Sequence, residues 1–244
     1  MSLHAVARDY VDGSVVGEHC HVGGQLIHAT AGVMQIRAAQ RLWLVPPRRA
    51  LWIPPRLAHA LRARGDVSLR TLYIETACAQ RLLGDVPRGF VVPTLVRELI
   101  LRMLDPCAAS DGERIGRLTA VLVDELADLD PEGVALSMPS DPRLARVCAG
   151  ILARPGEEHR IDELARRAGA SVRTLRRLAL HELGCPLSTW CQQARILSAV
   201  PMLIAGESVT RTAQALGYET TGAFAGMFRR FVGMSPREYS TSCG

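Results

Sequence analysis

The stretch "GYETTGAFAGMFRRFVGMSPREY", Gly217–Tyr239, decides the fold of the C-terminal part of this 244-residue chain. Apolar side chains recur along it with helical spacing, which predicts a helix with one buried face. The segment before it, which begins near Ser208, is expected to form a shorter helix that reaches a turn at Gly217. Two short helices joined through a turn glycine are typical of a helix-turn-helix.

The same design occurs earlier in the chain, in "IDELARRAGASVRTLRRLALHELG", Ile161–Gly184. There Ala165 lies on the packing face of a short helix, and Gly169 makes the turn. Ser171 is a good N-cap, so the second helix of this unit is predicted to begin near Val172. The C-terminal part is therefore expected to be all-α, with two helix-turn-helix units.

Three arginines share the exposed face of the second helix in this earlier unit: Arg173, Arg176 and Arg177. A solvated charged face is the ordinary explanation for such a group. A guanidinium can also bond O6 and N7 of guanine in the major groove, where each good pair discriminates between bases by about 1–3 kcal/mol. The position of this helix after a turn glycine, in a basic region, favours base reading.

The corresponding helix of the later unit is different. Its predicted buried face carries Phe224, Met227, Phe228 and Phe231. The opposite face contains Gly222 and Gly226, and each glycine costs a helix interior about 1 kcal/mol relative to alanine. The glycines either pack against a neighbouring helix or allow the backbone to approach another surface or a phosphate. The sequence leaves both explanations open.

Charge is distributed unevenly along the chain. Lysine is absent, and residues 1–140 carry 15 arginines and 15 acidic residues, whereas residues 141–244 carry 14 arginines and 9 acidic residues. The net charge of +5 therefore lies in the C-terminal part, where a polyanion would bind. The arginine-, alanine- and leucine-rich composition is typical of a GC-rich bacterial genome.

Neither an export signal nor an apolar run long enough to cross a membrane is found, so a cytoplasmic protein without a membrane partner is expected. The seven cysteines form no C-x-x-C pair, which favours reduced thiols over a disulfide framework or a zinc ribbon.

The N-terminal part has a different pattern. From Val15 to Glu75, short apolar runs alternate with glycine and proline, as in a small antiparallel β-barrel or sandwich. Helices are predicted over Pro93–Leu104 and Glu113–Leu129, and the segment Asp130–Pro142 has the composition of a linker. The second helix carries an apolar stripe, which is expected to be core or, alternatively, to pair with a partner chain: Ile115, Leu118, Leu122, Leu126 and Leu129.

From roughly Arg143 to Tyr239, the residues above and the segment "WCQQARIL", Trp190–Leu197, resemble the AraC/XylS-type transcription regulators. The resemblance implies seven helices and a joining helix that sets two recognition helices into successive major grooves, about 34 Å apart. The residues carried over from the family's first base-reading helix are Arg173, Thr174, Arg176 and Arg177, and those from its second are Thr221, Gly222 and Gly226. The exposed face of the second helix lacks long polar side chains, so it is expected to bind phosphate or DNA shape, with Arg229 and Arg230 at its end.

Two positions depart from the family pattern. Ala179 stands where an aromatic residue is usual, so the first unit is expected to pack less tightly. Pro201 falls inside the expected joining helix, where it removes a backbone donor and crowds the carbonyl of Leu197. The helix is therefore expected to kink or end at Pro201, which would change the angle between the two units.

The N-terminal part resembles the cupins. Gly13-x5-His19-x-His21-x3-Gln25-x6-Gly32 has the spacing of the first cupin motif, with Gln25 at a position that is usually glutamate. The second motif is weaker: Pro54 and His59 are correctly spaced, but Arg48 and Arg56 replace its glycines and Ala63 its asparagine. The resemblance implies a cupin-like barrel over residues 1–80.

Four residues of these motifs are candidate metal ligands: His19, His21, Gln25 and His59. Imidazole nitrogens bind divalent cations, and a glutamine oxygen would be a weak fourth ligand. The alternatives are a small-molecule effector pocket and a purely structural histidine cluster. Trp43 and Trp52 are expected either in the core or lining the barrel.

Together these features predict an α+β multidomain protein. It has a cupin-like sensor barrel over residues 1–80, a helical dimerisation segment over 81–135 and a DNA-binding domain over 141–241. The predicted function is a homodimeric, sequence-specific transcriptional regulator and not an enzyme. Its expected partners are double-stranded promoter DNA, a small-molecule effector and, if it activates, RNA polymerase.

Two other functions are compatible with parts of the sequence. A metal-dependent oxygenase or isomerase would use the three histidines, but Gln25 and the lost glycines argue against it. A non-specific DNA-coating protein would need more positive charge than +5.

Overall fold

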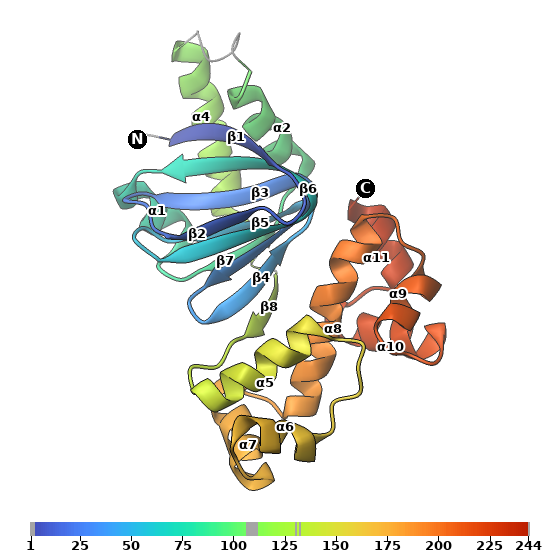
Figure 1. Cartoon of the computed structure of the whole chain (residues 1–244). Coiled ribbons are helices and arrows are strands. Elements are labelled where there is room, and N and C mark those ends of the chain that lie inside the picture. Colours follow the sequence, from blue (N-terminus) through green and yellow to red (C-terminus); the bar gives the residue numbers. More distant parts are fainter. Residues whose placement is uncertain (1–2, 106–111, 130, 132, 244) are drawn as a thin grey trace. The chain divides into compact units, whose positions relative to one another are not determined.

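The structure is a computed structural model that describes residues 3–105, 112–129, 131 and 133–243. The chain divides into two compact units (Figure 1). Unit 1 consists of residues 1–39 and 43–134, and unit 2 of residues 40–42 and 135–244. None of the described helices is long and apolar enough to cross a membrane.

Unit 1 is built on an antiparallel sheet in which two long strands, β3 and β6, pair along most of their length. The edge of β6 that faces away from β3 pairs with β1 along one part of its length and with β2 along another. The edge of β3 that faces away from β6 pairs with β5 and has β4 as a further neighbour. The strands of the sheet are β1 (Leu3–Tyr10), β2 (Val15–His19), β3 (Gly24–Ala38), β4 (Arg41–Val45), β5 (Arg49–Ile53), β6 (His59–Ile74), β7 (Arg88–Val91) and β8 (Val134–Ser137).

In the region predicted as a barrel, the strands form a curved sheet that does not close. Its main path runs β1-β6-β3-β4-β8, and no ladder among the described strands joins the two ends of that path. The register between β3 and β6 shifts between Ala29 and Val33, and such bulges bend a strand and increase its twist. The long strands therefore curve around an interior without closing the hydrogen-bonded circuit.

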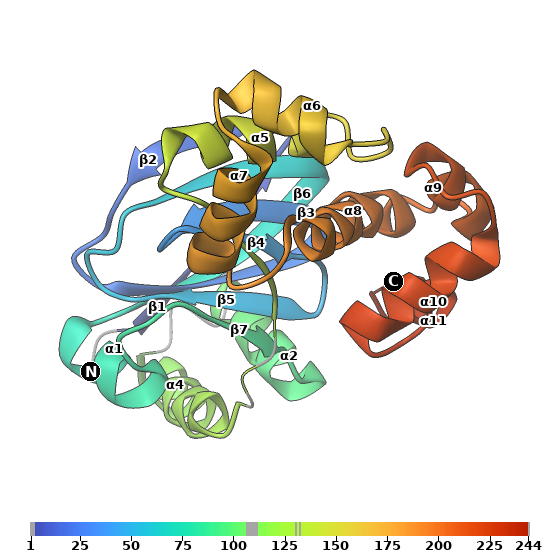
Figure 2. The same ribbon diagram turned by 90° about the horizontal axis from the view of Figure 1, so that it is seen from below.

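Three helices cover one side of the sheet (Figure 2). They are α1 (Thr76–Leu83), α2 (Thr94–Met103) and α4 (Gly112–Ala127). Leu26 and Trp52 of the sheet form one apolar core with Ile100 of α2 and Leu122 of α4. The other members of the α4 stripe are buried or pack against this core, so the core explanation of the stripe is correct.

Trp52 is fully buried in this core, and its Nε1 donates to the carbonyl oxygen of Gly84 at 2.9 Å. A Cβ on Gly24 would lie 1.9 Å from the Trp52 ring, so only glycine fits beside it. Trp52 is thus a core residue and does not line the interior of the sheet.

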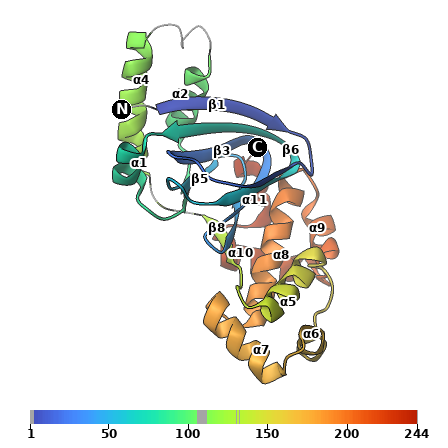
Figure 3. The same cartoon turned by 60° about the vertical axis from the view of Figure 1, so that its left-hand side comes forward.

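Unit 2 is helical, and α8 connects two groups of helices (Figure 3). At one end of α8 lie α5, α6 and α7, and at the other lie α9, α10 and α11. The helices are α5 (Pro142–Ala153), α6 (Ile161–Ala168), α7 (Val172–Leu178), α8 (Leu187–Ile204), α9 (Val209–Ala215), α10 (Thr221–Val232) and α11 (Pro236–Cys243).

The sequence predicts that α8 kinks or ends at Pro201, and the helix does not end there, because it continues to Ile204. A kink at Pro201 stays a prediction. Proline costs a helix interior about 3 kcal/mol. Trp190, Leu197 and Val200 are buried along α8 and hold it in the core of unit 2, which offsets that cost.

The segment before α5 is attached to unit 2. Trp190 donates from Nε1 to the carbonyl oxygen of Ser137 at 2.7 Å. The carboxylate of Glu182 accepts from the backbone N–H groups of Ser140 at 2.8 Å and Asp141 at 3.0 Å. Asp141 then caps α5, and its hydrogen bonds from Arg143 lower the pKa of the Asp141 carboxyl to about 2.

Candidate DNA-binding surface and histidine cluster

The first helix-turn-helix of unit 2 consists of α6 and α7. α6 ends at Gly169, whose φ of 65° lies in the left-handed region that glycine adopts without strain. The hydroxyl of Ser171 accepts from the backbone N–H of Thr174 at 3.1 Å, so α7 begins at Val172 as predicted. Leu175 and Leu178 are buried and orient the helix.

The arginines of α7 are exposed. Arg173, Arg176 and Arg177 all lie on the surface of unit 2, on the side of α7 away from Leu175. Thr174 is half-buried, and its hydroxyl lies 2.9 Å from that of Ser171. Thr174 therefore takes part in the helix cap, which leaves three long cationic side chains on one face.

After Leu178 the helix changes to a π-helical turn, Ala179–Leu183. Ala179 is fully buried, whereas the next residue, Leu180, is 57% exposed. A groove of about 530 Å³ lies beside this turn, and its lining is mainly apolar, including Leu164 and Leu187, together with Arg176.

The second helix-turn-helix consists of α9 and α10. Gly217 makes the turn with a φ of 74°, and the hydroxyl of Thr220 accepts from the backbone N–H of Ala223 at 3.1 Å. The large residues of α10 that are buried are Phe224, Met227 and Phe228. Phe231, which was predicted to be buried, is only half-buried, because it lies in the last turn of the helix.

The two glycines of α10 face open space. A Cβ built on Gly222 or on Gly226 meets no atom of the described chain within 4 Å. The explanation that they pack against a neighbouring helix is therefore wrong. Thr221 is half-buried at the start of the same helix. The exposed face of α10 is consequently flat, with few side chains that extend from it.

Arg229 and Arg230 are exposed in the last turn of α10. Nη2 of Arg230 donates to Oε1 of Gln192 on α8 at 2.6 Å, and its guanidinium carbon lies 5.1 Å from the centre of the Phe231 ring. Since a guanidinium has five donor hydrogens, this contact positions Arg230 and leaves donors for another acceptor.

A contact between the two groups of helices at the ends of α8 was missed from the sequence. Arg195 of α8 donates from Nε to the carbonyl oxygen of Pro155 at 3.0 Å, and its guanidinium carbon lies 5.3 Å from the centre of the Tyr218 ring. A Cβ on Gly217 would lie 2.1 Å from the carbonyl oxygen of Gly156.

We call Arg195, Gly156 and Gly217, all of unit 2, the clasp. The clasp joins the α5–α6 loop to the turn of the second helix-turn-helix. It therefore constrains the angle that Pro201 was expected to change. In the sequence, the clasp is indicated only by the glycines of two distant turns, Gly156 and Gly217.

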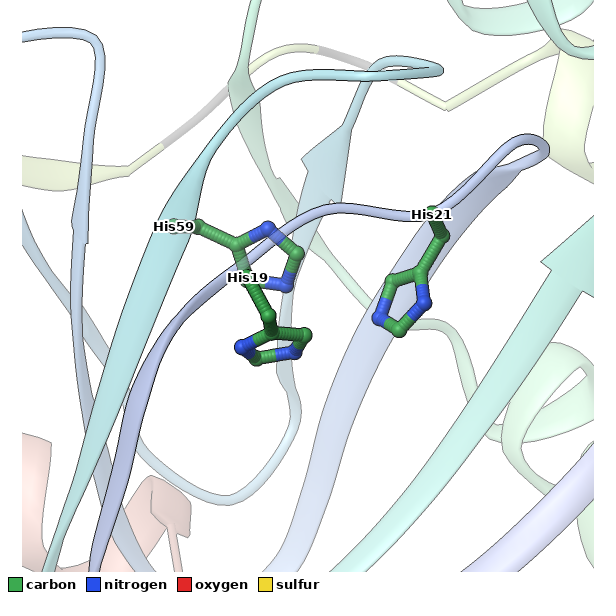
Figure 4. A group of neighbouring side chains, drawn as sticks. All are labelled: His19, His21 and His59. Carbon is green, nitrogen blue, oxygen red and sulfur yellow. The ribbon is translucent and has the colours of Figure 1, made fainter.

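The predicted metal-binding residues lie together in unit 1. His19, at the end of β2, is paired in register with His59 at the start of β6, and His21 follows β2. The His19 and His59 ring centres are 4.4 Å apart, and that of His21 lies 4.9 Å from His19 and 5.4 Å from His59. Figure 4 shows the three rings turned toward one space.

Backbone carbonyl groups orient two of these rings. Nδ1 of His19 donates to the carbonyl oxygen of Gly17 at 2.8 Å, and Nδ1 of His59 donates to that of Leu57 at 3.0 Å. Burial lowers the pKa of His21 and of His59 below the ordinary histidine value. Burial therefore favours the neutral form of both rings.

Gln25 reaches the cluster across the interior of the curved sheet. In the ladders it lies opposite Ile53 and Tyr73, whereas His59 lies opposite His19 and Ala38. Oε1 of Gln25 is nevertheless 3.1 Å from Nε2 of His59, and Nε2 of Gln25 donates to the Tyr73 hydroxyl at 3.2 Å. Tyr73 also packs edge-on against His21, a role for which the sequence had no signal.

The two arginines at glycine positions of the second motif retain glycine-like backbone geometry. Arg48 and Arg56 have φ angles of 63° and 62°, which cost a non-glycine residue about 1–2 kcal/mol each. The backbone N–H of Arg56 donates to the carbonyl oxygen of His21 at 2.7 Å. The turn at Arg56 thus holds His21 beside the other two histidines.

Comparisons with known proteins agree with this architecture. Residues 4–168 match the family model of an AraC-like ligand binding domain, and residues 164–242 match that of a helix-turn-helix domain. The HTH-type transcriptional regulator NimR of Escherichia coli (strain K12) is 31% identical over 222 residues, 91% of this chain and 81% of NimR. The HTH-type transcriptional regulator RipA of Corynebacterium glutamicum is 32% identical over 101 residues, 41% of this chain and 30% of RipA.

Among solved structures, the DNA-binding domain of the transcriptional factor AdpA in complex with a target DNA is 35% identical. The match covers 42% of this chain and 93% of the AdpA domain, with a TM-score of 0.39. The comparisons give no support to the metal-dependent enzyme. An AraC-like ligand-binding domain spans more than half of the sequence and a helix-turn-helix domain follows it, so the chain belongs to the AraC family of DNA-binding transcriptional regulators.

Proposed function

We propose that the two recognition helices of this regulator perform different tasks on a promoter. α7 reads bases through Arg173, Arg176 and Arg177, with Thr174 at the helix cap. The observation that carries the proposal is the exposure of three arginines on one face of a short helix, fixed by the Ser171 cap and the turn at Gly169. Bidentate guanidinium–guanine contacts require this kind of projecting, oriented side chain.

α10 lies against the DNA backbone in this proposal. Its flat face at Gly222 and Gly226 permits a closer approach than side chains would allow, and Thr221 and Arg229 lie at its two ends. Arg229 and Arg230 then contact phosphates, which position the protein on DNA without selecting a sequence. The clasp holds α10 at a defined angle to α7.

Unit 1 serves as the sensor for a small-molecule effector, and two chains form a cytoplasmic homodimer that contacts RNA polymerase if the regulator activates transcription. Two exposed apolar residues on neighbouring helices support pairing of two chains: Leu95 of α2 is 48% exposed and Val121 of α4 is 44% exposed. In this arrangement, effector binding would change the geometry with which two DNA-binding units meet paired half-sites.

The test is a selection of preferred sites from random duplexes, followed by titration of the selected site and of a scrambled duplex. Arg176→Ala and Arg177→Ala are expected to weaken binding to the selected site by about 1–3 kcal/mol while leaving binding to the scrambled duplex nearly unchanged. Arg37→Ala, at an exposed position on β3 in unit 1, removes the same charge and should change neither.

An equal loss on both duplexes would assign the two arginines to phosphate contacts. Failure of the selection to enrich any site would refute sequence-specific recognition.

A further inference from the structure

We propose that the groove beside the π-helical turn of unit 2 binds a small amphipathic anion, that is, a molecule with an apolar ring system or chain and one acidic group. The walls of this groove come from the loop after α5, from α6 and α7, and from the start of α8, which lie together at one end of unit 2 (Figure 3). All of its lining residues belong to unit 2, so the proposed site is separate from the interior of unit 1.

The size and lining of the groove are those of a small-molecule site. Its volume of about 530 Å³ lies in the range of about 300–1,000 Å³ that is usual for ligand pockets. Ile161, Leu164 and Leu187 provide apolar surface from two different helices. Such sites combine an apolar wall, which supplies most of the contact area, with a few polar groups that orient the ligand.

Leu180 is the first reason to expect an apolar ligand body. The regular α-helix ends at Leu178, and the π-helical turn Ala179–Leu183 then buries Ala179 and leaves Leu180 exposed at the groove. π-Helical turns are rare and occur frequently at functional sites. An apolar molecule in the groove would remove the leucine side chain from water, which is favourable.

The charge of the lining favours an anionic ligand. No carboxylate lines the groove among the described residues, whereas Arg176 does, and it has no hydrogen-bond or ion-pair partner among them. Its guanidinium can bond a carboxylate or sulfonate through two parallel hydrogen bonds. Ser188, which is exposed, offers its hydroxyl as a further donor.

The thiol of Cys191 does not oppose this charge. Cys191 is half-buried at the groove, and burial raises the pKa of its thiol above the ordinary cysteine value. The thiol therefore stays protonated at neutral pH and adds no negative charge beside the guanidinium.

Occupation of the groove would oppose DNA recognition, and this consequence rests on the proposed function of α7. Arg176 is one of the three arginines assigned to base reading, and a guanidinium held in the groove by an anion cannot also make a bidentate contact with guanine. The ligand and the specific DNA site should therefore weaken each other's binding by the same factor, because coupling between two binding equilibria is reciprocal.

The experiment titrates the full chain with two fluorescent probes that differ only in charge. Anilinonaphthalenesulfonate is the amphipathic anion, and phenylnaphthylamine has the same rings without the sulfonate. Arg176→Ala should weaken binding of the sulfonate probe by about three- to tenfold and leave the neutral probe unchanged. Leu180→Ser should weaken both probes by about three- to tenfold, because both place their rings against this side chain.

Arg177→Ala is the matched control. It removes the same charge one position along α7, about 100° around the helix, at a residue that does not line the groove. Neither probe should bind this variant differently from the wild type. The substituted residues are all exposed, and circular dichroism of each variant checks that unit 2 remains folded.

Competition with DNA is measured on the same preparations by gel shift. Saturating sulfonate probe should weaken binding to the selected duplex by about 5- to 150-fold, the factor that corresponds to one bidentate arginine–guanine contact. The selected duplex should weaken binding of the probe by the same factor. Binding to the scrambled duplex, which depends on phosphate contacts, should change little.

Equal binding of the sulfonate probe to the wild type, Arg176→Ala and Leu180→Ser would overturn the proposal, because the probe would then lie elsewhere on the chain. Absence of saturable binding would also overturn it and would favour a protein segment as the occupant of the groove. Probe binding that follows both substitutions without any effect on the selected duplex would refute the competition. Failure to select any DNA site, with probe binding intact, would refute the proposed function alone.

Discussion

The two helix-turn-helix units of this regulator share a topology and differ in the surfaces they present. Both have a left-handed turn glycine and a hydroxyl N-cap before the second helix. α7 then exposes three arginines over an aliphatic core, whereas α10 exposes two glycines over an aromatic core in which Phe224, Phe228 and Tyr239 pack at steep angles to one another. One fold thus supports either long side chains that reach bases or a bare backbone that approaches closely.

The turn glycines provide the sharpest contrast between the two units. Gly217→Ala places a methyl group 2.1 Å from the carbonyl oxygen of Gly156, in addition to the strain of a positive φ. Gly169→Ala meets only that strain, because nothing lies within 4 Å. We expect losses of about 2–5 kcal/mol and about 1–2 kcal/mol respectively in the free energy of unfolding, measured by urea titration. Equal losses would mean that the clasp is not a rigid contact.

The glycines of α10 should separate stability from DNA binding. Because both positions face open space, the double variant Gly222→Ala/Gly226→Ala should stabilise the chain by roughly 1–2 kcal/mol, since alanine is the better helix former. The added methyl groups should nevertheless weaken DNA binding, measured by gel shift at fixed salt. Unchanged affinity would show that this face does not lie against the DNA.

The smallest expected effect concerns the end of α10. Arg229→Ala should weaken binding to selected and scrambled duplexes equally and reduce the slope of log affinity against log salt by about one unit. Arg176→Ala should instead reduce the preference for the selected site. If Arg229→Ala also changed sequence preference, the division of tasks between the two helices would be wrong.

Local sequence patterns predicted both helix-turn-helix units, the Ser171 cap and the exposure of the α7 arginines, because these depend on residues within a few positions of one another. Motif spacing likewise brought His19, His21, Gln25 and His59 together, since it encodes strand register. Two features depend on distant segments and could not be predicted. The clasp joins residues from separate helical groups, and closure of the sheet would depend on pairing between strands far apart in the sequence.

The continuation of α8 through Pro201 has a related cause. A local rule assigns the proline a cost that can end a helix, but burial along α8 outweighs it. Similarly, arginine at positions 48 and 56 weakened the second motif, although the backbone there keeps the conformation that glycine would adopt.

The hydrogen bonds from Trp190 to Ser137 and from Ser140 and Asp141 to Glu182 have a practical consequence for protein engineering. They make residues 137–141 a fixed part of the DNA-binding unit, although their composition is that of a flexible tether. A chimera that replaces the sensor should therefore exchange the chain before Ser137. A junction placed at Pro142, where the first helix begins, would leave Glu182 and Trp190 without their partners and loosen the end of the recognition helix.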